Sequence, residues 1–523
     1  MKKLFLLVLF SLTGIFLFAG GEKDQTQSGS TSYDSSKILE ITWLGLNQMG
    51  ILPREGSAIQ RELEKRYNIK IKNVPVDSYN VEQMNLLLAT GVEFDIWSWG
   101  IKDVISAVET GTIRPLPLEM VKEHAPEFYK LYEETSPNWK YIGSHEGVLY
   151  GLPRVSDTFR SPVGLSVRTD WMKKVGITQI PKTLAELKEM LIRFRENDPD
   201  GNGRKDTYGL SIGGNGTLIA YLNPYLMGAY GVNMARWGVD TDGSPKAWAV
   251  QPEYRAALEE LSDWWAKGIY DPQVPLLNRV QQWERFGAGI TGGYFGTEWM
   301  LEPSRPGVGW SNLLKERPDL DPDTVFTHIP PVSGPKGAST LAYDVTLTSN
   351  AYYFGRNTSD EKLVRLLTLL NETLADPKLY VMATFGVEGV HFDLDSKGHV
   401  MIKPEWSTPE KYTELGYMRF LNNQFCPPEY VKYNYDSIRY RAWERIINYP
   451  VLPIHLVNGI QTSEDREYKS GVDTITQEYF YKVVTGEWKT SDTWDNYVSR
   501  VLNAGLQKQI DAKKRVAQEI SKY

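Results

Sequence analysis

The sequence contains very little cysteine and histidine. Its one cysteine, Cys426, excludes an intrachain disulfide, and its place beside Pro427 and Pro428 is typical of a buried small hydrophobic side chain. The six histidines lack the spacing of zinc ligands, such as His-x-x-x-His. The chain also lacks a Gly-x-Ser-x-Gly nucleophile elbow and a phosphate-binding loop of the Walker type. These absences leave zinc, serine-hydrolase and nucleotide chemistry without support.

Positive charge is also scarce. The chain has 58 lysines and arginines against 65 acidic residues, which gives a net charge of −7 and a pI near 5.6. We therefore expect no nucleic acid partner, because proteins that bind nucleic acids carry a basic excess or patch. The 16 tryptophans and 30 tyrosines are numerous. Aromatic rings stack on the faces of sugars, but a large core also absorbs many of them.

Long apolar runs are absent except at the N-terminus. Lys2 and Lys3 precede an apolar run over residues 4–18, and the small residues Ala19-Gly-Gly follow it, which is the pattern of a secretory signal. The run is shorter than the ~20 residues that a membrane span needs. We predict a signal peptide over 1–21 and a flexible tether over 22–37, which is rich in Ser, Thr, Gln and Gly. Because no cysteine follows the signal, we expect an exported protein, periplasmic or secreted, without an N-terminal lipid anchor.

Oxygen-bearing side chains recur in the segment 198–206, which reads Asp-Pro-Asp-Gly-Asn-Gly-Arg-Lys-Asp. Gly203 stands at the sixth position, where an EF-hand loop turns sharply, and the carbonyl of Arg204 stands at the seventh. Hard oxygen donors in this spacing predict a structural Ca²⁺ site. The predicted metal set, including the residue that closes the motif, is Asp198, Asp200, Asn202, Arg204, Asp206 and Thr207.

The twelfth position of this loop departs from an EF-hand. Gly209 stands where the bidentate glutamate is expected, so we interpret the segment as a pseudo-EF loop completed by a neighbouring residue or by water. The alternative is a solvated turn of Asp, Asn and Gly that ends a helix. Nothing nearby suggests that the metal would take part in catalysis.

Strand and helix patterns alternate in the N-terminal part of the chain. Strands are predicted at 38–43, 69–74 and 94–97, with helices at 56–67 and around 84–88. This alternation predicts an α/β fold with a mostly parallel sheet. Because ligands bind beyond the carboxyl ends of such strands, six residues are candidate ligand contacts. They are Trp43, Asn47 and Gln48 after the first strand, and Asp95, Trp97 and Trp99 at the third.

Later segments show clear helix and turn signals. Thr183 and Glu186 form a predicted capping box before an apolar helical pattern that runs into the metal loop. Further helices are predicted over 253–267, ending at Gly268, and over 359–372. The segment 240–244 begins like a calcium loop, but Pro245 falls where that loop needs glycine, so we predict a hairpin turn there.

The segment 164–210 resembles a family of extracellular solute-binding proteins that serve carbohydrate ABC importers. The resemblance is to the branch with lipoprotein-type and alginate-oligosaccharide-binding members. Its motif is matched by Arg168, Asp170, Trp171, Lys174, Gly176, Pro181, Thr183 and Glu186, followed by 198–207. Shorter matches follow the family's order along nearly the whole chain. They are Glu146-Gly-Val-Leu-Tyr-Gly-Leu-Pro153, Lys267-Gly-Ile-Tyr-Asp-Pro272, Gly386-Val-Glu-Gly-Val-His-Phe392 and Trp494-Asp-Asn-Tyr-Val498.

The resemblance implies a two-lobe fold of the periplasmic-binding-protein type (class II), with hinge-linked lobes and a sugar held in the cleft between them. We expect the N-terminal lobe at 38–155, the C-terminal lobe at 156–337, a return to the first lobe at 338–404 and a helical segment of the second lobe at 405–523. The implied partners are an oligosaccharide and the permease subunits of an ABC transporter. We expect a monomer without enzymatic activity.

Further candidate ligand contacts follow from the resemblance and from loop position. They are Arg154 after the first crossover, Tyr230, Glu298 and Trp299 at the end of a glycine-rich strand, Tyr343 and Asp344 near the return to the first lobe, and Glu388. A core role is the alternative for Trp299 and is favoured for Tyr230. For Glu388, a hydrogen bond to the lobe's own backbone is slightly favoured over a ligand contact.

Two other functions remain open at this point. A secreted glycoside hydrolase needs only two suitably placed carboxylates, and the chain has 65 acidic residues. The same fold also binds solutes other than sugars, such as peptides, because fold does not fix the ligand. The order of the crossover motif, the metal loop and the Gly-Val-Glu-Gly segment favours the sugar-binding protein.

Overall fold

Two separate β-sheets, each with its own hydrophobic core, organise the residues from Ser35 onward. The computed structural model describes residues 34–47, 52–77, 80–98, 104–135, 139–153, 164–211, 223–233, 236–277, 279–296, 308–321, 324–335, 351–421, 427–434, 437–450, 452–453 and 455–521. We call the first sheet with its core the first lobe, and the second sheet with its core the second lobe. The predicted α/β fold with two lobes is therefore confirmed.

The first sheet contains the predicted N-terminal strands. Its order is β2 (Ile69–Asn73), β1 (Leu39–Leu44), β3 (Ile96–Trp97), β13 (Ala351–Phe354) and β6 (Gly151–Pro153). β1 pairs in parallel with β2 and β3, as the alternation of strands and helices predicted. β13 runs antiparallel to both β3 and β6, so the chain returns to this sheet after a long excursion.

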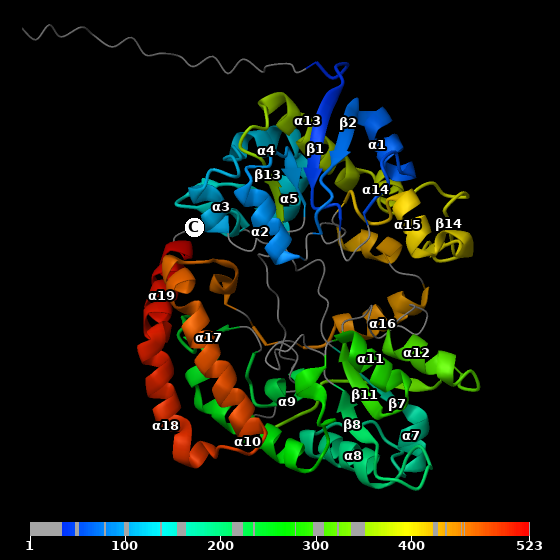
Figure 1. The fold of residues 1–523 in the computed structure, drawn as a ribbon, viewed down its shortest axis with the longest axis vertical. Helices are drawn as coiled ribbons and strands as arrows, with labels where there is room; N and C mark the ends of the chain where they lie inside the picture. Colours follow the sequence, from blue (N-terminus) through cyan, green and yellow to red (C-terminus); the bar gives the residue numbers. More distant parts are fainter. Residues whose placement is uncertain are drawn as a thin grey trace, which may run out of the picture. The chain divides into compact units, whose positions relative to one another are not determined.

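Helices on both sides of the first sheet come from two distant parts of the sequence (Figure 1). The N-terminal part contributes α1 (Ala58–Tyr67), α2 (Val81–Ala89), α3 (Val104–Glu109), α4 (Leu118–His124), α5 (Pro126–Thr135) and α6 (Trp139–Ile142), with the β4 (Ser144–His145) and β5 (Val148–Leu149) hairpin. The returning part contributes α13 (Asp360–Ala375), α14 (Pro377–Phe385), β14 (Phe392–Leu394), β15 (Val400–Ile402) and α15 (Pro409–Leu415). α13 begins at the Ser359 cap and buries Leu363, Leu366 and Leu370 on one face, as its spacing predicted.

The second sheet has the order β12 (Phe326–Ile329), β7 (Gly164–Arg168), β11 (Thr291–Gly296) and β8 (Tyr208–Ser211). β11 is parallel to β8 but antiparallel to β7. Its helices are α7 (Thr169–Lys174), α8 (Leu184–Glu196), α9 (Pro224–Ala229), α10 (Pro252–Ala266), α11 (Arg279–Gly287) and α12 (Gly309–Glu316). The predicted capping box at the start of α8 is confirmed, as is the hairpin of β9 (Trp237–Val239) and β10 (Pro245–Ala247).

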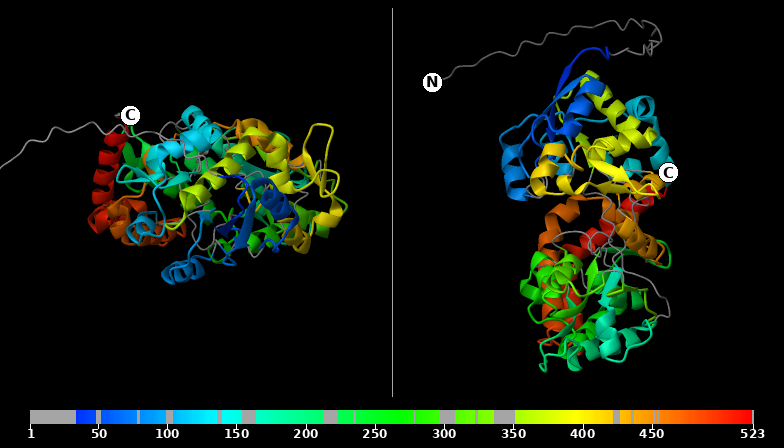
Figure 2. Two further views of the ribbon diagram at one scale, coloured as in Figure 1. Left: turned by 90° about the horizontal axis from the view of Figure 1, so that it is seen from above. Right: turned by 90° about the vertical axis from the view of Figure 1, so that its right-hand side faces the viewer.

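Three C-terminal helices complete the second lobe. They are α17 (Ser463–Val484), α18 (Thr490–Val501) and α19 (Gln507–Ile520), and they appear orange to red in both views of Figure 2. α17 packs on α10, and α19 packs on β10. Val472, Tyr479 and Phe480 of α17 are buried in the core of the second lobe. One face of this long helix is therefore fixed by packing, which leaves the opposite face for other contacts.

The chain passes from the first to the second lobe later than residue 405, where the sequence placed the crossing. Leu415, Phe420 and Tyr430 lie in the core of the first lobe. Within α16 (Ser437–Ile447), Trp443 packs against that core, whereas Ile446 belongs to a cluster with Trp310 in the second lobe. The apolar pattern after 405 showed that these side chains would be buried, but it carried no information about which core would accept them.

Candidate ligand-binding site

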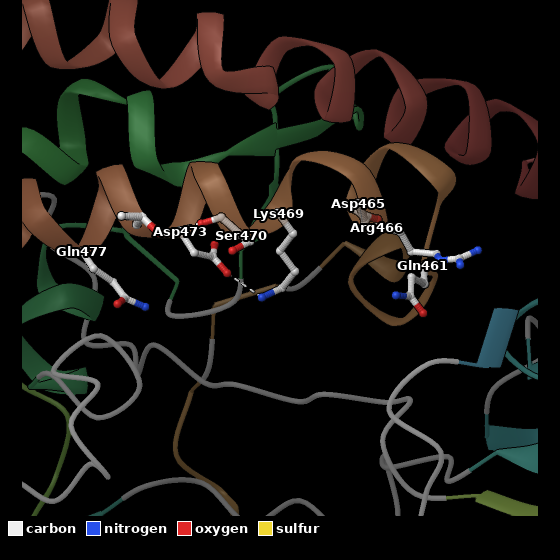
Figure 3. Close-up of a pocket in the computed structure, with 8 residues that line it drawn as sticks. Gln461, Asp465, Arg466, Lys469, Ser470, Asp473 and Gln477 are labelled. Carbon is white, nitrogen blue, oxygen red and sulfur yellow. Dashed lines mark hydrogen bonds and ion pairs between the residues drawn. The ribbon is translucent and has the colours of Figure 1, made fainter. Parts of the chain in front are cut away.

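Polar side chains along one face of α17 line an open groove of about 570 Å³. We call it the α17 groove. Its lining consists of Gln461, Asp465, Arg466, Lys469, Ser470, Asp473, Thr474 and Gln477, most of which are drawn and labelled in Figure 3. Gln461 precedes α17, and the positions from Asp465 to Gln477 recur in steps of one, three and four residues, which places them on one side of the helix. The groove therefore presents amides, hydroxyls and charges, and more polar than apolar surface.

Asp473 is a lining carboxylate that pairs with two cations. One of its oxygens accepts from Nη1 of Arg236 at 2.5 Å, and the other accepts from Nζ of Lys469 at 2.5 Å. Nη2 of Arg236 in turn donates to Oε1 of Gln509 in α19, at 2.7 Å. The Arg236 guanidinium is thus held from two sides, and it fixes Asp473 in place from behind the helix.

Asp465 anchors the start of α17 beneath the groove. Its carboxylate accepts from the backbone N–H of Thr462 at 3.0 Å, which forms half of a capping box. The buried ammonium of Lys513 lies 2.6 Å from the same carboxylate and also donates to the carbonyl of Val457. Burial lowers the pKa of Lys513, while the adjacent Asp465 acts against that shift. Because these groups satisfy one another, Asp465 is a structural anchor rather than an available ligand contact.

The α17 groove lies next to the first lobe. Nη1 of Arg466 is 2.9 Å from Oε1 of Glu109, the last residue of α3, and both side chains are partly exposed. An exposed ion pair of this kind contributes at most about 1 kcal/mol. The pair nevertheless shows that the polar face of α17 borders α3, a helix that packs on the first sheet.

Three of the predicted ligand contacts are buried in the first lobe. Trp43 is fully buried, and its indole N–H donates to the hydroxyl of Ser98 at 3.0 Å. Trp97 is 2% exposed and packs edge-to-face on Phe94. Both tryptophans are core side chains in this structure, because consecutive residues are buried at the end of β1, which holds Trp43, and in β3, which holds Trp97. Strand topology predicted that these residues lie near the carboxyl ends of the strands, but it did not predict that their rings point into the core.

Asp95 is bonded to the protein rather than directed toward a ligand. Its Oδ2 accepts from the backbone N–H of Thr42 at 2.8 Å, and Nζ of Lys362 lies 2.9 and 2.8 Å from its two oxygens. Asp95 is only 6% exposed. The carboxylate therefore links β1, β3 and α13, and this structural role replaces the predicted ligand contact.

Three further candidates lie at half-buried or exposed positions. Asn47 is half-buried and forms a β-bridge with Asp77. Tyr230 is half-buried at the end of α9, where desolvation raises the pKa of its phenol. Glu388 is exposed in the turn before β14, and its backbone bridges to Phe392. The other seven predicted contacts lie outside the described residues: Gln48, Trp99, Arg154, Glu298, Trp299, Tyr343 and Asp344.

The predicted metal loop follows α8 directly. Asp198 accepts from the backbone N–H groups of Gly201, Asn202 and Gly203 at 2.9 to 3.1 Å. Gly203 has a φ of +76°, which is the sharp turn that the motif predicted at its sixth position. The hydroxyl of Thr207 is buried and donates to the carbonyl of Phe194, so this residue fastens the loop to α8 instead of facing a metal.

Two carboxylates of the loop accept hydrogen bonds from one side-chain amide, that of Asn202. The side-chain amide of Asn202 donates to Asp200 at 2.8 Å and to Asp206 at 3.1 Å. The Gly203 N–H holds the pKa of Asp198 below its usual value, whereas burial and the neighbouring Asp198 raise the pKa of Asp200. Across the described ranges, no three carboxylate, histidine or cysteine side chains are grouped closely enough to hold a metal. The donor chemistry nevertheless fits Ca²⁺, because crowded carboxylates and an amide oxygen are its preferred ligands.

The sequence did not identify the α17 groove. A signal was present, because Asp465, Lys469, Asp473 and Gln477 follow one another at four-residue intervals. Such a pattern is also what any solvated helix face shows, so it does not mark a site without the tertiary contacts. Arg236 is 237 positions away from Asp473, and no local pattern links them.

The two sheets, the late crossing through α16 and a polar groove bordering both lobes define a two-lobe solute-binding protein. The family of bacterial extracellular solute-binding proteins matches residues 51–366, and the chain belongs to it. Within the described residues, no helix combines the length and apolar composition that a membrane crossing requires.

Known relatives cover nearly the whole chain. The polygalacturonan/rhamnogalacturonan-binding protein YtcQ of Bacillus subtilis (strain 168) is 22% identical over 515 residues, which is 96% of each chain. Among solved structures, the alginate-binding protein AlgQ2 without calcium ion has a TM-score of 0.69 at 17% identity. An EF-hand mutant of the S. pneumoniae ABC-transporter substrate-binding protein FusA, in complex with fructo-nystose, has a TM-score of 0.65 at 18% identity. Each of these two structural matches covers 93% of this chain and 99% of the other. They establish the shared fold.

Proposed function

We propose that this solute-binding protein captures an oligosaccharide and delivers it, as a monomer, to the permease of an ABC importer. The α17 groove carries the proposal, because its amides, hydroxyls and charged groups match the many hydroxyls of a sugar. The relatives support it: YtcQ is named for binding polysaccharides, and FusA is an ABC-transporter protein crystallised with fructo-nystose.

The groove would bind the ligand through side chains that are already held in place. Arg236 and Gln509 position Asp473, and the Asp465–Lys513 pair anchors the start of α17 beneath the groove, so little ordering is needed when a ligand arrives. The Arg466–Glu109 pair closes one edge of the groove against the first lobe. A ligand that contacts both lobes would stabilise the closed arrangement by its differential affinity for it.

We propose binding without cleavage. The relatives named above are binding proteins, and the carboxylates that line the groove are already engaged: Asp473 by Arg236 and Asp465 by Lys513. A glycosidase needs one carboxylic acid that carries a proton beside a second, free carboxylate. Asp473 and Asp465 do not supply a free carboxylate, because each is paired with a fixed cation.

Native mass spectrometry tests the proposal directly. The chain from residue 22 onward would be mixed with pooled plant and algal oligosaccharides. We expect at least one intact oligosaccharide to be retained at one copy per chain. Loss of long oligosaccharides together with new short products would show an enzyme instead, and retention of no saccharide at all would overturn the proposal.

We further propose that Ca²⁺ stabilises the second lobe through Asp198, Asp200, Asn202 and Asp206. The ion would supply the positive charge around which these oxygens gather, in the place of the weaker Asn202 amide. AlgQ2 is described without its calcium ion and FusA as an EF-hand mutant, which supports calcium binding among the relatives. The role is structural, because the loop follows α8 and is not part of the α17 groove.

The calcium proposal predicts a loss of thermal stability. Asp198→Ala combined with Asp200→Ala should lower the Tm in calcium buffer and abolish the difference between calcium and chelator. An ion at about 100 times its Kd stabilises by about 2.7 kcal/mol, which corresponds to several degrees in Tm. Ligand affinity should change little.

A matched control is available in the β9–β10 hairpin. Asp240 and Asp242 begin a similar sequence, but Pro245 stands where a calcium loop needs glycine. Asp240→Ala with Asp242→Ala should leave the response to calcium intact. If the unmodified protein melts at the same temperature in calcium and in chelator, the calcium proposal is wrong.

A further inference from the structure

We propose that the α17 groove selects acidic oligosaccharides, and that Lys469 pairs with a carboxylate of the sugar. This inference rests on the proposed function and specifies the class of its ligand. It follows from the way in which the carboxylates of the groove are neutralised from within the protein, which leaves a cation at the surface available to a ligand.

Two of the groove's four charged side chains are carboxylates with fixed partners behind the helix. Asp473 is held by Arg236 at 2.5 Å, and Asp465 by the buried Lys513 at 2.6 Å. Neither carboxylate depends on a residue of the groove itself for charge balance. The groove would therefore repel an acidic ligand less than its sequence suggests, because both negative charges are compensated from inside the lobe.

The other charges around the groove are paired within the protein. Arg236 pairs with Asp473, Lys513 with Asp465, Arg466 with Glu109, and Arg515 with Glu464. Lys469 differs from these cations because its partner, Asp473, has a second counterion in Arg236.

Lys469 is the cation that is free to exchange its partner. Its side chain is 59% exposed, and within the described part of the chain its ion-pair partner is Oδ2 of Asp473, at 2.5 Å. An exposed pair at i and i+4 on a helix is weak. If Lys469 turned toward a ligand carboxylate, Asp473 would keep Arg236 as its counterion. Arg236 is not exchangeable in this way, because Gln509 holds its other nitrogen.

Neutral donors and acceptors surround Lys469 along the same face. Ser470, Thr474 and Gln477 line the groove beyond it, and Gln461 lines it on the other side. At 1.5 Å per residue, the helix from Asp465 to Gln477 is about 18 Å long, which accommodates more than one sugar ring. The arrangement therefore suits a chain of hydroxyl-bearing rings with a carboxylate near its middle.

The first experiment is native mass spectrometry with a mixed pool of trisaccharides. The acidic members are the trimers of galacturonate, mannuronate and guluronate and an aldouronic acid from glucuronoxylan; the neutral members are maltotriose, cellotriose, xylotriose and kestose. Retention of an acidic trisaccharide supports the inference. Retention of neutral ones alone overturns it but leaves the proposed function standing. Retention of none overturns both.

Calorimetry then compares the retained acidic trisaccharide with its carboxyl-reduced, neutral form. We expect the reduced form to bind at least tenfold more weakly. Lys469→Gln should weaken the acidic ligand about fivefold or more and the reduced ligand less than twofold, because only a charge-assisted contact is lost. Lys469→Arg should restore most of the affinity for the acidic ligand.

Lys482 provides the matched control on the same helix. Its ammonium pairs with Glu487 at 3.0 Å, outside the groove. Lys482→Gln should therefore leave both affinities unchanged. If Lys469→Gln weakens the acidic and reduced ligands equally, Lys469 does not recognise the carboxylate, and the inference is wrong.

Discussion

Replacing Asp95 with alanine is expected to destabilise the first lobe by about 3 kcal/mol, one of the two largest effects that we predict. The substitution leaves the Lys362 ammonium and the backbone N–H of Thr42 without their acceptor at a nearly buried site. Removing one partner of a buried ion pair commonly costs about 3–5 kcal/mol, and the partial exposure of Lys362 places this case at the lower end. Urea unfolding should show a lower midpoint with an unchanged slope.

The same variant separates a structural role of Asp95 from a role in ligand binding. Both carboxylate oxygens are engaged by the protein, so we expect Asp95→Ala to retain its affinity for oligosaccharide at temperatures where it remains folded. Asp319→Ala is a control, because its ion pair with Arg317 is solvent-exposed and should contribute nothing measurable. If the variant is as stable as the wild type but loses its affinity for the ligand, Asp95 contacts the ligand, as strand topology predicted.

The sequence was sufficient to predict those features that form within a few neighbouring residues. The capping box of Thr183 and Glu186, the helix that follows it and the turn at Gly203 all form within a few residues, and each is found as predicted. Short-range hydrogen bonds and backbone geometry decide such features, so the pattern of side chains is enough to predict them. The same holds for β1 and β2, whose apolar runs and flanking helices specify a parallel pair.

The sequence was insufficient where a residue's role depends on which way it faces. Trp43 and Trp97 lie where topology predicts a ligand, yet both are core side chains. The end of β1 and strand β3 are buried at consecutive positions, so inward and outward positions cannot be told apart by alternation. Asp95 was predicted as a ligand contact for a similar reason: its partner Lys362 is 267 positions away.

The α17 groove shows the same limit for the site itself. Its charge balance is set by Arg236 and Lys513, which lie outside the groove-lining face and far apart in sequence. A count of charges on α17 alone finds two cations and two carboxylates among the lining residues, which predicts no preference for an acidic ligand. Only the tertiary structure shows that the carboxylates are neutralised from behind and that Lys469 is not.

Replacing Gly505 with alanine should destabilise the second lobe by about 3 kcal/mol or more. Gly505 lies between α18 and α19 with a φ of +116°, where an L side chain is strained. An added Cβ would lie 2.3 Å from Cγ of Tyr468, close to the stem of that side chain. Rotation of the ring does not remove the clash, because the added Cβ would also lie 2.5 Å from Cβ of Tyr468.

This destabilisation should reach the groove, because Tyr468 immediately precedes Lys469 in α17. We expect Gly505→Ala to lower the midpoint of urea unfolding and to weaken oligosaccharide binding at the same time. Gly471→Ala, on the same helix, should have the opposite effect on stability: its added Cβ meets nothing within 4 Å, and alanine is favoured over glycine in a helix by about 1 kcal/mol. If the Gly505→Ala protein is as stable as the wild type, α17 does not pack against the turn before α19. The position of Asp473 beside Lys469 would then not be fixed by that packing.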